Sequence, residues 1–265
     1  MKNLDIYCVT NKRLEFLEKT SLKLVGVGNG NFSQEYISCN TKKNIYYKEK
    51  YYSELTFHYW YWKNILQNEK KEWVGFCQKR RYWIKPSEKK SLISQENLNE
   101  FLLTKIDENL DHFESFLCNP IKISGAKKIK IIKRGWRNLI KDPSIIFNEQ
   151  KQTISLHFDM HHGYKNLDKA IQLLDKEDRN DFLKYVKFQT SYNPHIMVIA
   201  KPHILEKWFT NLFLWLERCE EVFGFDELKG YDTQRLYAYL AERYLSFWFK
   251  KHTKFKTNPW TFIDF

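Results

Sequence analysis

The sequence has little glycine or proline, and its cysteines are not paired. Its 265 residues include 9 glycines and 6 prolines, too few for a collagen-like chain or a disordered chain rich in both. The five cysteines are widely spaced, with no C-x-x-C pair: Cys8, Cys39, Cys77, Cys118 and Cys219. This spacing argues against a disulfide framework and against a structural zinc site, so we expect free thiols in a reducing cytoplasm.

Long apolar segments are also absent. The longest, Trp208–Leu216, is interrupted by Thr210 and Asn211 and is shorter than the ~20 apolar residues of a membrane span. Met1–Phe16 alternates apolar and charged residues and contains no hydrophobic core of a signal peptide. We therefore expect a soluble cytoplasmic protein, and attachment at the inner face of the cytoplasmic membrane stays open.

Positive charge and aromatic side chains are in excess. Lys and Arg number 44 against 32 Asp and Glu, a net charge of +12, and 17% of the residues are Phe, Trp or Tyr. This balance favours anionic partners: nucleic acid, a membrane surface or a phosphorylated substrate. Lys127–Lys141 gathers basic residues around Trp136, a pattern typical of single-stranded nucleic-acid surfaces and of segments at anionic membranes. No nucleic-acid-binding motif accompanies it, and a solvated basic face explains it equally well.

The first 30 residues indicate an α/β fold. Asp5–Thr10 and Leu22–Val27 are short apolar runs typical of buried strands, and the apolar residues of Asn11–Thr20 between them have helical spacing. Strand, helix and strand in this order predict a βαβ unit and a parallel sheet. The glycines that follow, including Gly28, do not match G-x-G-x-x-G. They form either a turn at the strand end or a loop that contacts a nucleotide.

The rest of the chain continues this pattern without a repeat or a linker. We expect one domain over 1–265, with a nucleotide-binding half (1–120) and a helical acceptor half (121–265). Further strands are predicted at Trp73–Cys77, Ile121–Ile132, Ile154–Phe158 and His195–Ala200. Helices are predicted at Ser53–Leu66 (capped by Ser53), Glu96–Leu117, Leu167–Leu174, Ile204–Val222 and Thr233–Lys251.

Arg80 and Arg81 follow the strand predicted at Trp73–Cys77 almost directly. Ligands of open parallel sheets bind at the carboxyl ends of the strands. Two adjacent guanidinium groups there can clamp a phosphate or diphosphate through bidentate hydrogen bonds. A solvated pair of arginines at the sheet edge is the alternative.

Asp159, His161 and His162 follow the strand predicted at Ile154–Phe158. A carboxylate and imidazoles at a strand end can bind a divalent metal, supply acid–base groups or have a structural role. All three interpretations stay open.

Four charged residues begin and continue the last predicted helix: Asp232, Arg235, Glu242 and Arg243. Such charges usually form solvated ion pairs one turn apart. The tyrosines among them also fit a half-buried position.

Several stretches together resemble a bacterial family of capsular and exopolysaccharide biosynthesis glycosyltransferases. S-E-L-T-F-H-Y-W-Y-W-K-N at Ser53–Asn64 is similar to its E-L-x-x-x-Y-W-x-W-K-N motif, and V-G-F-C-Q-K-R-R-Y-W at Val74–Trp83 to its V-G-x-C-H-Y-R-R-Y-F motif. Asn193–Met197 stands where the family has an N-M-F-I-M-like run, and Arg235–Arg243 resembles its R-x-x-G-x-L-x-E-R helix. The resemblance covers most of the chain in order.

The chain departs from the family pattern in places. Gln78 and Lys79 replace a His-Tyr pair, and Pro194 and His195 replace Met and Phe. Where relatives have an aspartate-containing strand, this chain reads L-C-N-P at Leu117–Pro120. It is therefore a divergent member, whose donor or acceptor can differ from those of its relatives.

The resemblance implies a GT-A-like nucleotide-sugar-binding fold with a mostly parallel sheet, and transfer of a sugar from a UDP-sugar donor to a glycan or lipid-linked glycan acceptor. Three groups of residues are expected to form the site. The donor diphosphate would lie against Thr10, Asn11, Gly28, Glu54, Arg80 and Arg81. The sugar or acceptor would contact Tyr82, Asn193, His195, Arg235 and Arg243. The catalytic base would be Asp232 or Glu242, with His161 and His162 as alternatives.

The expected strand end after Cys77 has no D-x-D carboxylate pair, so the two arginines are expected to replace a metal ion against the diphosphate. No cofactor is expected, and a divalent cation such as Mg²⁺ or Mn²⁺ stays open. Besides the donor and acceptor, the partners considered are an anionic membrane surface and, as the alternative function, nucleic acid, which is not expected. A metal-dependent hydrolase built on Asp159 and His161 lacks further ligands.

Overall fold

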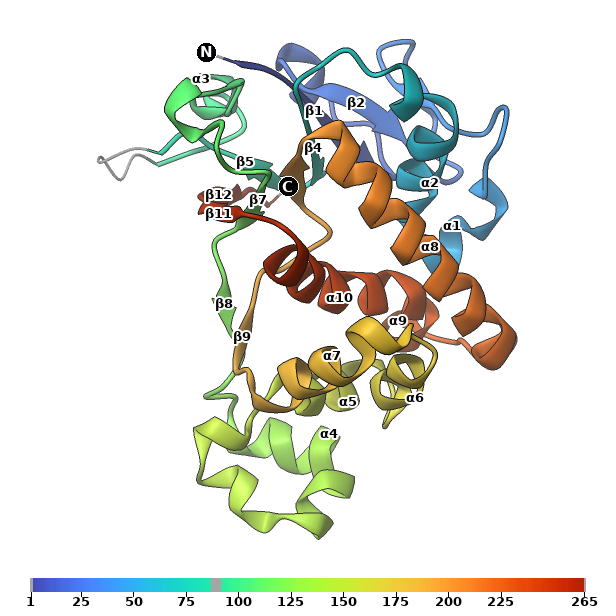
Figure 1. Cartoon of the computed structure of the whole chain (residues 1–265), viewed down its shortest axis with the longest axis vertical. Helices are drawn as coiled ribbons and strands as arrows, with labels where there is room; N and C mark the ends of the chain where they lie inside the picture. The colour runs from blue at the N-terminus through green and yellow to red at the C-terminus, as the bar shows by residue number, and fades with distance from the viewer. Residues whose placement is uncertain (1, 87–91, 265) are drawn as a thin grey trace. The chain divides into compact units, whose positions relative to one another are not determined.

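The computed structural model describes residues 2–86 and 92–264 (Figure 1). The chain forms two compact units. Unit 1 comprises residues 1–119, 195–210 and 249–265, and unit 2 comprises 120–194 and 211–248. Helices α8 (Pro202–Phe223) and α10 (Leu236–His252) each contribute residues to both. The single domain predicted from the sequence, with halves at 1–120 and 121–265, stays a prediction.

Unit 1 contains most of the strands. They are β1 (Lys2–Thr10), β2 (Lys23–Gly26), β3 (Ile37–Ser38), β4 (Trp73–Gln78), β5 (Arg81–Trp83), β6 (Lys105–Ile106), β7 (Ser115–Cys118), β10 (Val198–Ala200), β11 (Phe255–Asn258) and β12 (Trp260–Phe262). Its short helices are α1 (Glu49–Tyr52), α2 (Leu55–Asn64) and α3 (Leu98–Phe101).

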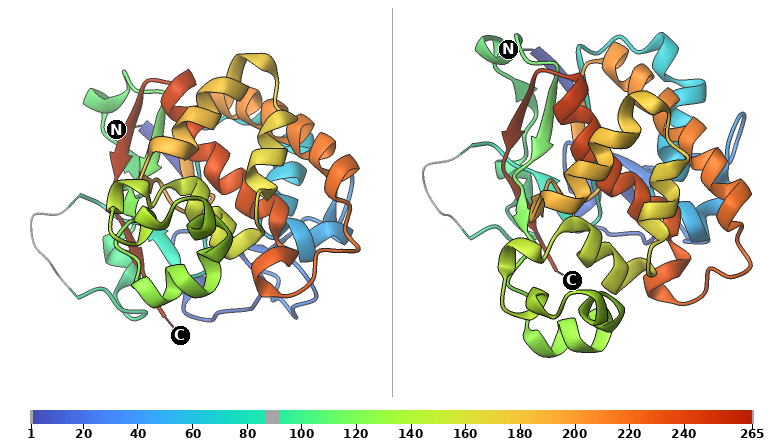
Figure 2. Two further views of the ribbon diagram at one scale, coloured as in Figure 1. Left: turned by 90° about the horizontal axis from the view of Figure 1, so that it is seen from below. Right: turned by 60° about the horizontal axis from the view of Figure 1, so that its bottom comes forward.

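These ten strands form one sheet, seven of them in the order β11-β7-β10-β4-β1-β2-β3. Off this path, β5 pairs with β4 and β12, and β6 pairs with β1. β1 runs parallel to β2 and to β4, β2 runs parallel to β3, and β7 runs parallel to β11, which lies beside it in Figure 2. β10 is antiparallel to both of its neighbours, β4 and β7. The mostly parallel sheet expected from the sequence is therefore present along this path of seven strands, in which β10 alone is reversed. Off the path, β5 and β6 are antiparallel to β4 and β1.

Both faces of the sheet are buried. On one face, Ile6, Cys8 and Cys77 belong to an apolar core, while on the other Tyr7 and Phe76 pack against aromatic residues of α2. The centre of the sheet is crowded: a Cβ at Gly75 of β4 would lie 2.9 Å from Ile199 Cγ1 and 3.1 Å from Ile6 Cγ1. Glycine at this position lets the side chains of the two neighbouring strands approach closely.

Unit 2 is mainly helical. It contains β8 (Ile121–Lys122), α4 (Lys128–Lys141), α5 (Ile154–His162), α6 (Asn166–Gln172), α7 (Lys176–Phe188), β9 (Ser191–Tyr192) and α9 (Tyr231–Gln234). Aromatic side chains hold its core: the Phe182 ring lies 5.3 Å from that of Tyr244, and Trp215 Nε1 donates a 2.8 Å hydrogen bond to the Ala170 carbonyl. β8 and β9 form a separate antiparallel pair.

Several predictions of elements are confirmed. β1 and β2 are parallel neighbours, as the βαβ interpretation requires, and α6 and α8 lie close to their predicted ranges. The helix predicted at Thr233–Lys251 is interrupted at Arg235, between α9 and α10. All five cysteines are buried free thiols. In the described part of the chain, no helix combines the length and apolar character needed to cross a membrane.

Other predictions are wrong. The strand predicted at Ile154–Phe158 is helix α5, whose first turn is capped by Thr153, and Ile121–Ile132 is the short strand β8 followed by the start of α4. The helix predicted at Asn11–Thr20 is only a 3-10 turn at Leu17–Lys19. Here the backbone N–H of Leu14 donates to the Tyr36 hydroxyl at 3.0 Å instead of to a helical carbonyl.

The helix predicted at Glu96–Leu117 is α3 followed by β6 and β7. Its last residues become a strand because they pair with β10 and β11, partners far away in the sequence. The helix predicted at Ser53–Leu66 is shorter, and Ser53 forms no side-chain cap. On this helix Tyr59 and Trp62 are only half-buried, whereas Phe57 and Tyr61 are fully buried.

Candidate functional site

The carboxyl ends of β1, β2 and β4 meet at one edge of the sheet in unit 1. Val9 is paired with Gln78, and Thr10 with Gly26. The Thr10 side chain is buried and folds the following loop: its Oγ1 donates to the Lys12 carbonyl at 2.6 Å and accepts from the Lys12 N–H at 3.1 Å. This edge is where a parallel sheet binds its ligands.

The loop after β2 carries Gly28 in the left-handed region, at a φ of 73°. A Cβ at this position would lie 3.2 Å from the Glu49 carboxylate, and the Tyr46 hydroxyl donates to the Gly28 carbonyl. The backbone conformation therefore favours glycine here, and a Cβ would also have to displace the Glu49 carboxylate. The loop after β2 is therefore held in one conformation by Gly28 and Tyr46. Its predicted contact with a nucleotide stays a prediction.

The turn between β4 and β5 is linked to neighbouring segments by side chains. The Lys79 ammonium donates to Asn11 Oδ1, and the Gln78 amide donates to the Glu54 carboxylate at the start of α2. Gln78 stands where the motif of the glycosyltransferase family that the sequence resembles has a histidine. Its hydrogen bond thus orients Glu54. Four of the predicted donor-binding positions, Thr10, Asn11, Glu54 and Arg80, belong to or contact this one edge of unit 1.

Arg80 lies in the β4–β5 turn, and Arg81 begins β5. Arg80 Nη2 is 3.4 Å from the Asp264 carboxylate, and both side chains are well exposed. The Arg81 guanidinium lies 5.5 Å over the Phe262 ring, and its buried Nε has no hydrogen-bond partner in the described ranges. Two guanidinium groups thus stand at the end of a central strand, as the sequence predicts.

Tyr82 and His195 have different surroundings in unit 1. Tyr82 is fully buried and donates its hydroxyl hydrogen bond to the Lys79 carbonyl, so it supports the turn that carries the arginines. His195 precedes β10, and because β10 is antiparallel to β4, it lies at the same sheet edge. It has a φ of 65°, and its ring meets that of Trp260 edge-on at 5.0 Å. Positive φ outside glycine is uncommon and is found at turns and functional sites.

In unit 2 a buried arginine organises the predicted catalytic residues. Arg243 is 1% exposed and pairs with the carboxylate of the adjacent Glu242. Its Nη2 lies 3.3 Å from His157 Nδ1 and 3.5 Å from His162 Nε2, and its guanidinium is 4.5 Å from the centre of the Tyr192 ring. The expectation of a solvated charge is wrong for Arg243, because these partners replace water around it.

The histidines of this cluster are held neutral. Burial, followed by the charge of Arg243, lowers the pKa of His157 to about 2 and that of His162 to about 3. Burial, followed by the charges of Lys130 and Arg134, lowers the pKa of His161 to about 4. Taking the groups out of water and placing cations beside them both disfavour the protonated form.

Hydrogen bonds assign the ring nitrogens. His162 Nδ1 faces the Asp232 carbonyl at 2.9 Å and must carry the proton, which leaves Nε2 to accept from Arg243. His161 Nδ1 accepts from Arg134 Nη1 at 2.9 Å, and the same Nη1 lies 3.1 Å from the Asp232 carboxylate. The lone pairs of both histidines are therefore engaged.

The remaining predicted residues of unit 2 lie apart from this cluster or are structural. Asn193 is buried, and its backbone N–H and Oδ1 both bond Ser246 Oγ at 2.9 Å. Arg235, at the break between α9 and α10, lies 5.9 Å over the Tyr231 ring. Asp159 accepts from Asn138 and the Lys165 backbone, and burial raises its pKa. In the described ranges, no three His, Cys, Asp or Glu side chains gather as a metal-binding group, and the predicted lack of a metal stays a prediction.

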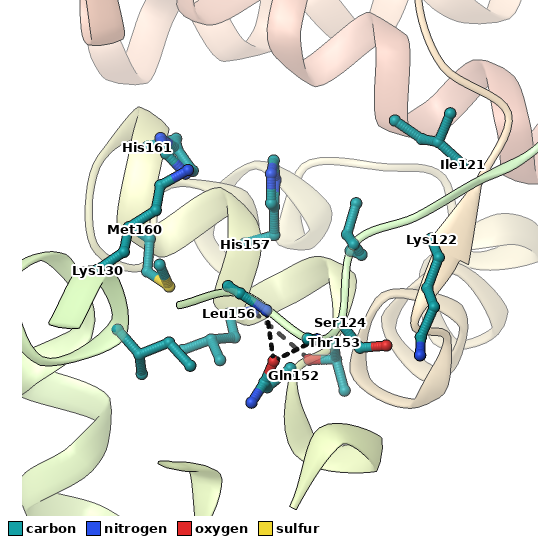
Figure 3. A pocket seen from close by; sticks show the side chains of 14 residues that line it. Ile121, Lys122, Ser124, Lys130, Gln152, Thr153, Leu156, His157, Met160 and His161 are labelled. Carbon is teal, nitrogen blue, oxygen red and sulfur yellow. Dashed lines mark hydrogen bonds between the residues drawn. The ribbon is translucent and has the colours of Figure 1, made fainter. Parts of the chain in front are cut away.

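Unit 2 also contains an open pocket of about 340 Å³, which the sequence did not reveal (Figure 3). Lys130, His157 and His161 lie along its wall, and Figure 3 shows the Lys130 side chain extending toward His161. Gln152 closes its base by accepting from the Gly125 N–H at 2.7 Å. His157 was missed in the sequence; its spacing of four residues from His161 on a helix was the available signal, hidden by the wrong strand assignment.

Comparison with known proteins places this geometry in context. The fold is similar to that of the WbbM bifunctional glycosyltransferase in its apo form, with a TM-score of 0.74 and 19% sequence identity over 99% of this chain. The match covers 46% of that chain, so this protein spans less than half of its length. The likeness confirms the predicted mixed α/β fold with its mostly parallel central sheet. No curated protein matches the sequence. A family described as a domain of unknown function, DUF4422, matches residues 5–253, and the chain therefore belongs to the DUF4422 family.

Proposed function

We propose that this protein is a glycosyltransferase that moves a sugar from a nucleoside-diphosphate sugar, expected to be a UDP-sugar, to a hydroxyl group of a glycan acceptor. The observation that carries the proposal is the cationic β4–β5 turn at the carboxyl edge of the sheet, in a chain whose fold matches that of a glycosyltransferase. Capsule, O-antigen or exopolysaccharide is the proposed destination of the sugar, on the resemblance of the motifs alone.

The transfer breaks the bond between the anomeric carbon and the diphosphate oxygen, and the diphosphate leaves with the electron pair. The acceptor oxygen bonds to the anomeric carbon, and its proton passes to a base. Negative charge builds on the leaving diphosphate, so fixed cations placed there stabilise the transition state. Arg80 and Arg81 present guanidinium groups of the geometry that binds phosphate oxygens. We propose that they serve this purpose without a metal held by a D-x-D motif.

The proposed base is a carboxylate of unit 2. Asp232 is exposed and lies 3.1 Å from Arg134, and Glu242 is held beside Arg243. His162 is a poor base because one nitrogen donates to the Asp232 carbonyl and the other accepts from Arg243. His161 remains the weaker alternative, since its Nδ1 lone pair accepts from Arg134.

A donor screen with product analysis by mass spectrometry tests the function. The protein is incubated with a panel of nucleotide sugars, and release of the nucleoside diphosphate and sugar transfer are followed. Asp232→Asn or Glu242→Gln should lower turnover by roughly 10²–10⁴-fold, the range of general-base catalysis.

Asp175→Asn is the matched control, because Asp175 is also an exposed aspartate paired with an arginine of unit 2, at 2.8 Å. It should retain full turnover. If Asp232→Asn, Glu242→Gln and substitutions of both His161 and His162 all retain turnover, the base assignment fails. If no nucleotide sugar is consumed by the wild-type protein, the proposed function itself is wrong.

A further inference from the structure

Helix α4 is apolar on two sides, and one of them faces solvent. On the inner side, Ile131 is fully buried and packs in a small core with Leu156 and Met160 of α5. On the outer side, four large apolar residues are half or more exposed: Ile129 (62%), Ile132 (50%), Trp136 (51%) and Ile140 (73%). We call these four residues the α4 ridge.

The α4 ridge is continuous. Its members follow at i, i+3, i+7 and i+11, the spacing that places side chains along one strip of a helix. The described residues include twelve exposed large apolar side chains, and five of them fall within 129–147, Phe147 at 78% being the fifth. Scattered exposed apolar residues are ordinary, but a contiguous apolar strip marks an interaction surface.

The charged residues of α4 itself are all positive. The 14 residues of α4 contain no Asp or Glu and six basic residues: Lys128, Lys130, Lys133, Arg134, Arg137 and Lys141. Arg134 is occupied by Asp232, while the Arg137 guanidinium lies 5.2 Å over the Trp136 ring and Lys128 Nζ 4.9 Å over the Phe147 ring. Cations and apolar side chains thus share one outward surface.

We propose that the α4 ridge binds the surface of an anionic lipid bilayer, with α4 lying in the plane of the interface. Apolar side chains buried among acyl chains and cations at the headgroup level are the two features that hold such helices on membranes. Each basic residue near an anionic surface adds to the attraction. Three of the four ridge residues are isoleucines, which offer no flat surface for stacking bases, so single-stranded nucleic acid fits this strip less well.

This inference goes beyond the proposed transfer reaction and concerns a different surface. It does not depend on the arginines of the β4–β5 turn. Arg80→Ala should therefore bind vesicles like the wild type while losing transfer, which separates failure of one proposal from failure of the other.

Vesicle flotation tests the proposal. Full-length protein is mixed with phosphatidylcholine vesicles, or with vesicles of phosphatidylcholine and phosphatidylglycerol in a ratio of about 7:3, at low and high salt. Binding is expected with the anionic vesicles and should weaken as salt screens the charges. The double variant Ile132→Ser/Trp136→Ser should lower the partition coefficient at least tenfold, because each side chain loses its apolar burial.

The matched control is Leu214→Ser/Val222→Ser on α8, because these apolar residues are equally exposed, at 50% and 55%. It should bind like the wild type. Lys133→Gln, on the flank of the ridge, should lower binding to anionic vesicles about fivefold and leave binding to neutral vesicles unchanged. Circular dichroism checks that each variant is folded.

Three results would overturn the proposal. Wild-type protein that does not float with anionic vesicles at low salt contradicts it directly. Equal loss in the ridge variant and the α8 control shows that the ridge is not the contact surface. Saturable binding to a single-stranded oligonucleotide that the ridge variant abolishes, without vesicle binding, assigns the surface to nucleic acid instead.

Discussion

The Lys79 ammonium donates a hydrogen bond to Asn11 Oδ1, and this contact joins the β4–β5 turn to the loop that follows β1. The two segments are 68 residues apart in the sequence. Their contact brings a third cation beside Arg80 and Arg81 at the edge where β1, β2 and β4 end.

The Lys79–Asn11 contact predicts a binding defect without a loss of fold. Lys79→Met should weaken UDP binding about tenfold, because a cation and the link to the β1 loop are both removed. Titration calorimetry measures the affinity, and thermal unfolding checks the fold. Lys23→Met is the control: Lys23 pairs with Asp5 at 2.6 Å, and it starts β2 rather than ending it. Equal affinity of Lys79→Met and the wild type contradicts a role for this turn in donor binding.

Arg243 predicts a large effect on stability. Arg243→Met should lower the free energy of unfolding by about 3–5 kcal/mol, since it removes the buried cation that pairs with the Glu242 carboxylate. Urea unfolding followed by circular dichroism gives the value.

Arg218→Met is the comparison for Arg243, because Arg218 pairs with Asp175 at the surface of the same unit. An exposed pair contributes about 1 kcal/mol or less, so this variant should unfold close to the wild type. If Arg243→Met and Arg218→Met lower the free energy of unfolding by similar amounts, the buried ion pair of Arg243 stabilises the fold no more than an exposed pair does.

His58 predicts a dependence of stability on pH. It is fully buried on α2, its ring centre is 4.4 Å from that of Phe76, and burial lowers its pKa to about 3. Its Nδ1 has no hydrogen-bond partner among the described residues. The unfolded chain takes up a proton here below pH ~6.5 while the folded chain stays neutral, so stability falls as the pH falls from about 6.5 toward 3.

His58→Phe should remove this contribution. We compare the free energy of unfolding of the variant with that of the wild type at each pH. This difference should be about 2 kcal/mol more favourable to the variant at pH 5 than at pH 8. Urea unfolding at the two pH values measures this difference. A change in stability that is the same at both pH values would show that His58 titrates alike in the folded and unfolded chains.

The sequence alone allowed the strand that ends beside Arg80 to be predicted. It did not allow the buried cluster around Arg243 in unit 2 to be predicted. Trp73–Cys77 is a continuous apolar run, so its assignment as a buried strand, and the place of Arg80 just after it, followed from residue type alone. The burial of Arg243 depends on His157 and Tyr192, at 86 and 51 positions from it in the chain. A pattern along one helix cannot reveal partners that only tertiary folding brings together.

Helix α5 shows why periodicity misled. Its buried residues alternate along the chain, Ile154, Leu156, Phe158, Met160 and His162, which is the pattern of a strand. Four helices, α4, α6, α7 and α9, contact α5, so more than one of its sides is buried. The partly exposed residues of α5 therefore alternate with the buried ones. Thr153 at the N-cap was the local signal for a helix.

The central claim is that Arg80 binds the diphosphate of the donor without a metal ion. Titration calorimetry with UDP in the presence of a chelator tests it most directly, with Arg218→Ala as an arginine control that belongs to unit 2. We predict saturable binding by the wild type and by Arg218→Ala, and loss of at least tenfold in affinity for Arg80→Ala. Binding that disappears with the chelator in the wild type, or that Arg80→Ala retains in full, would contradict the account.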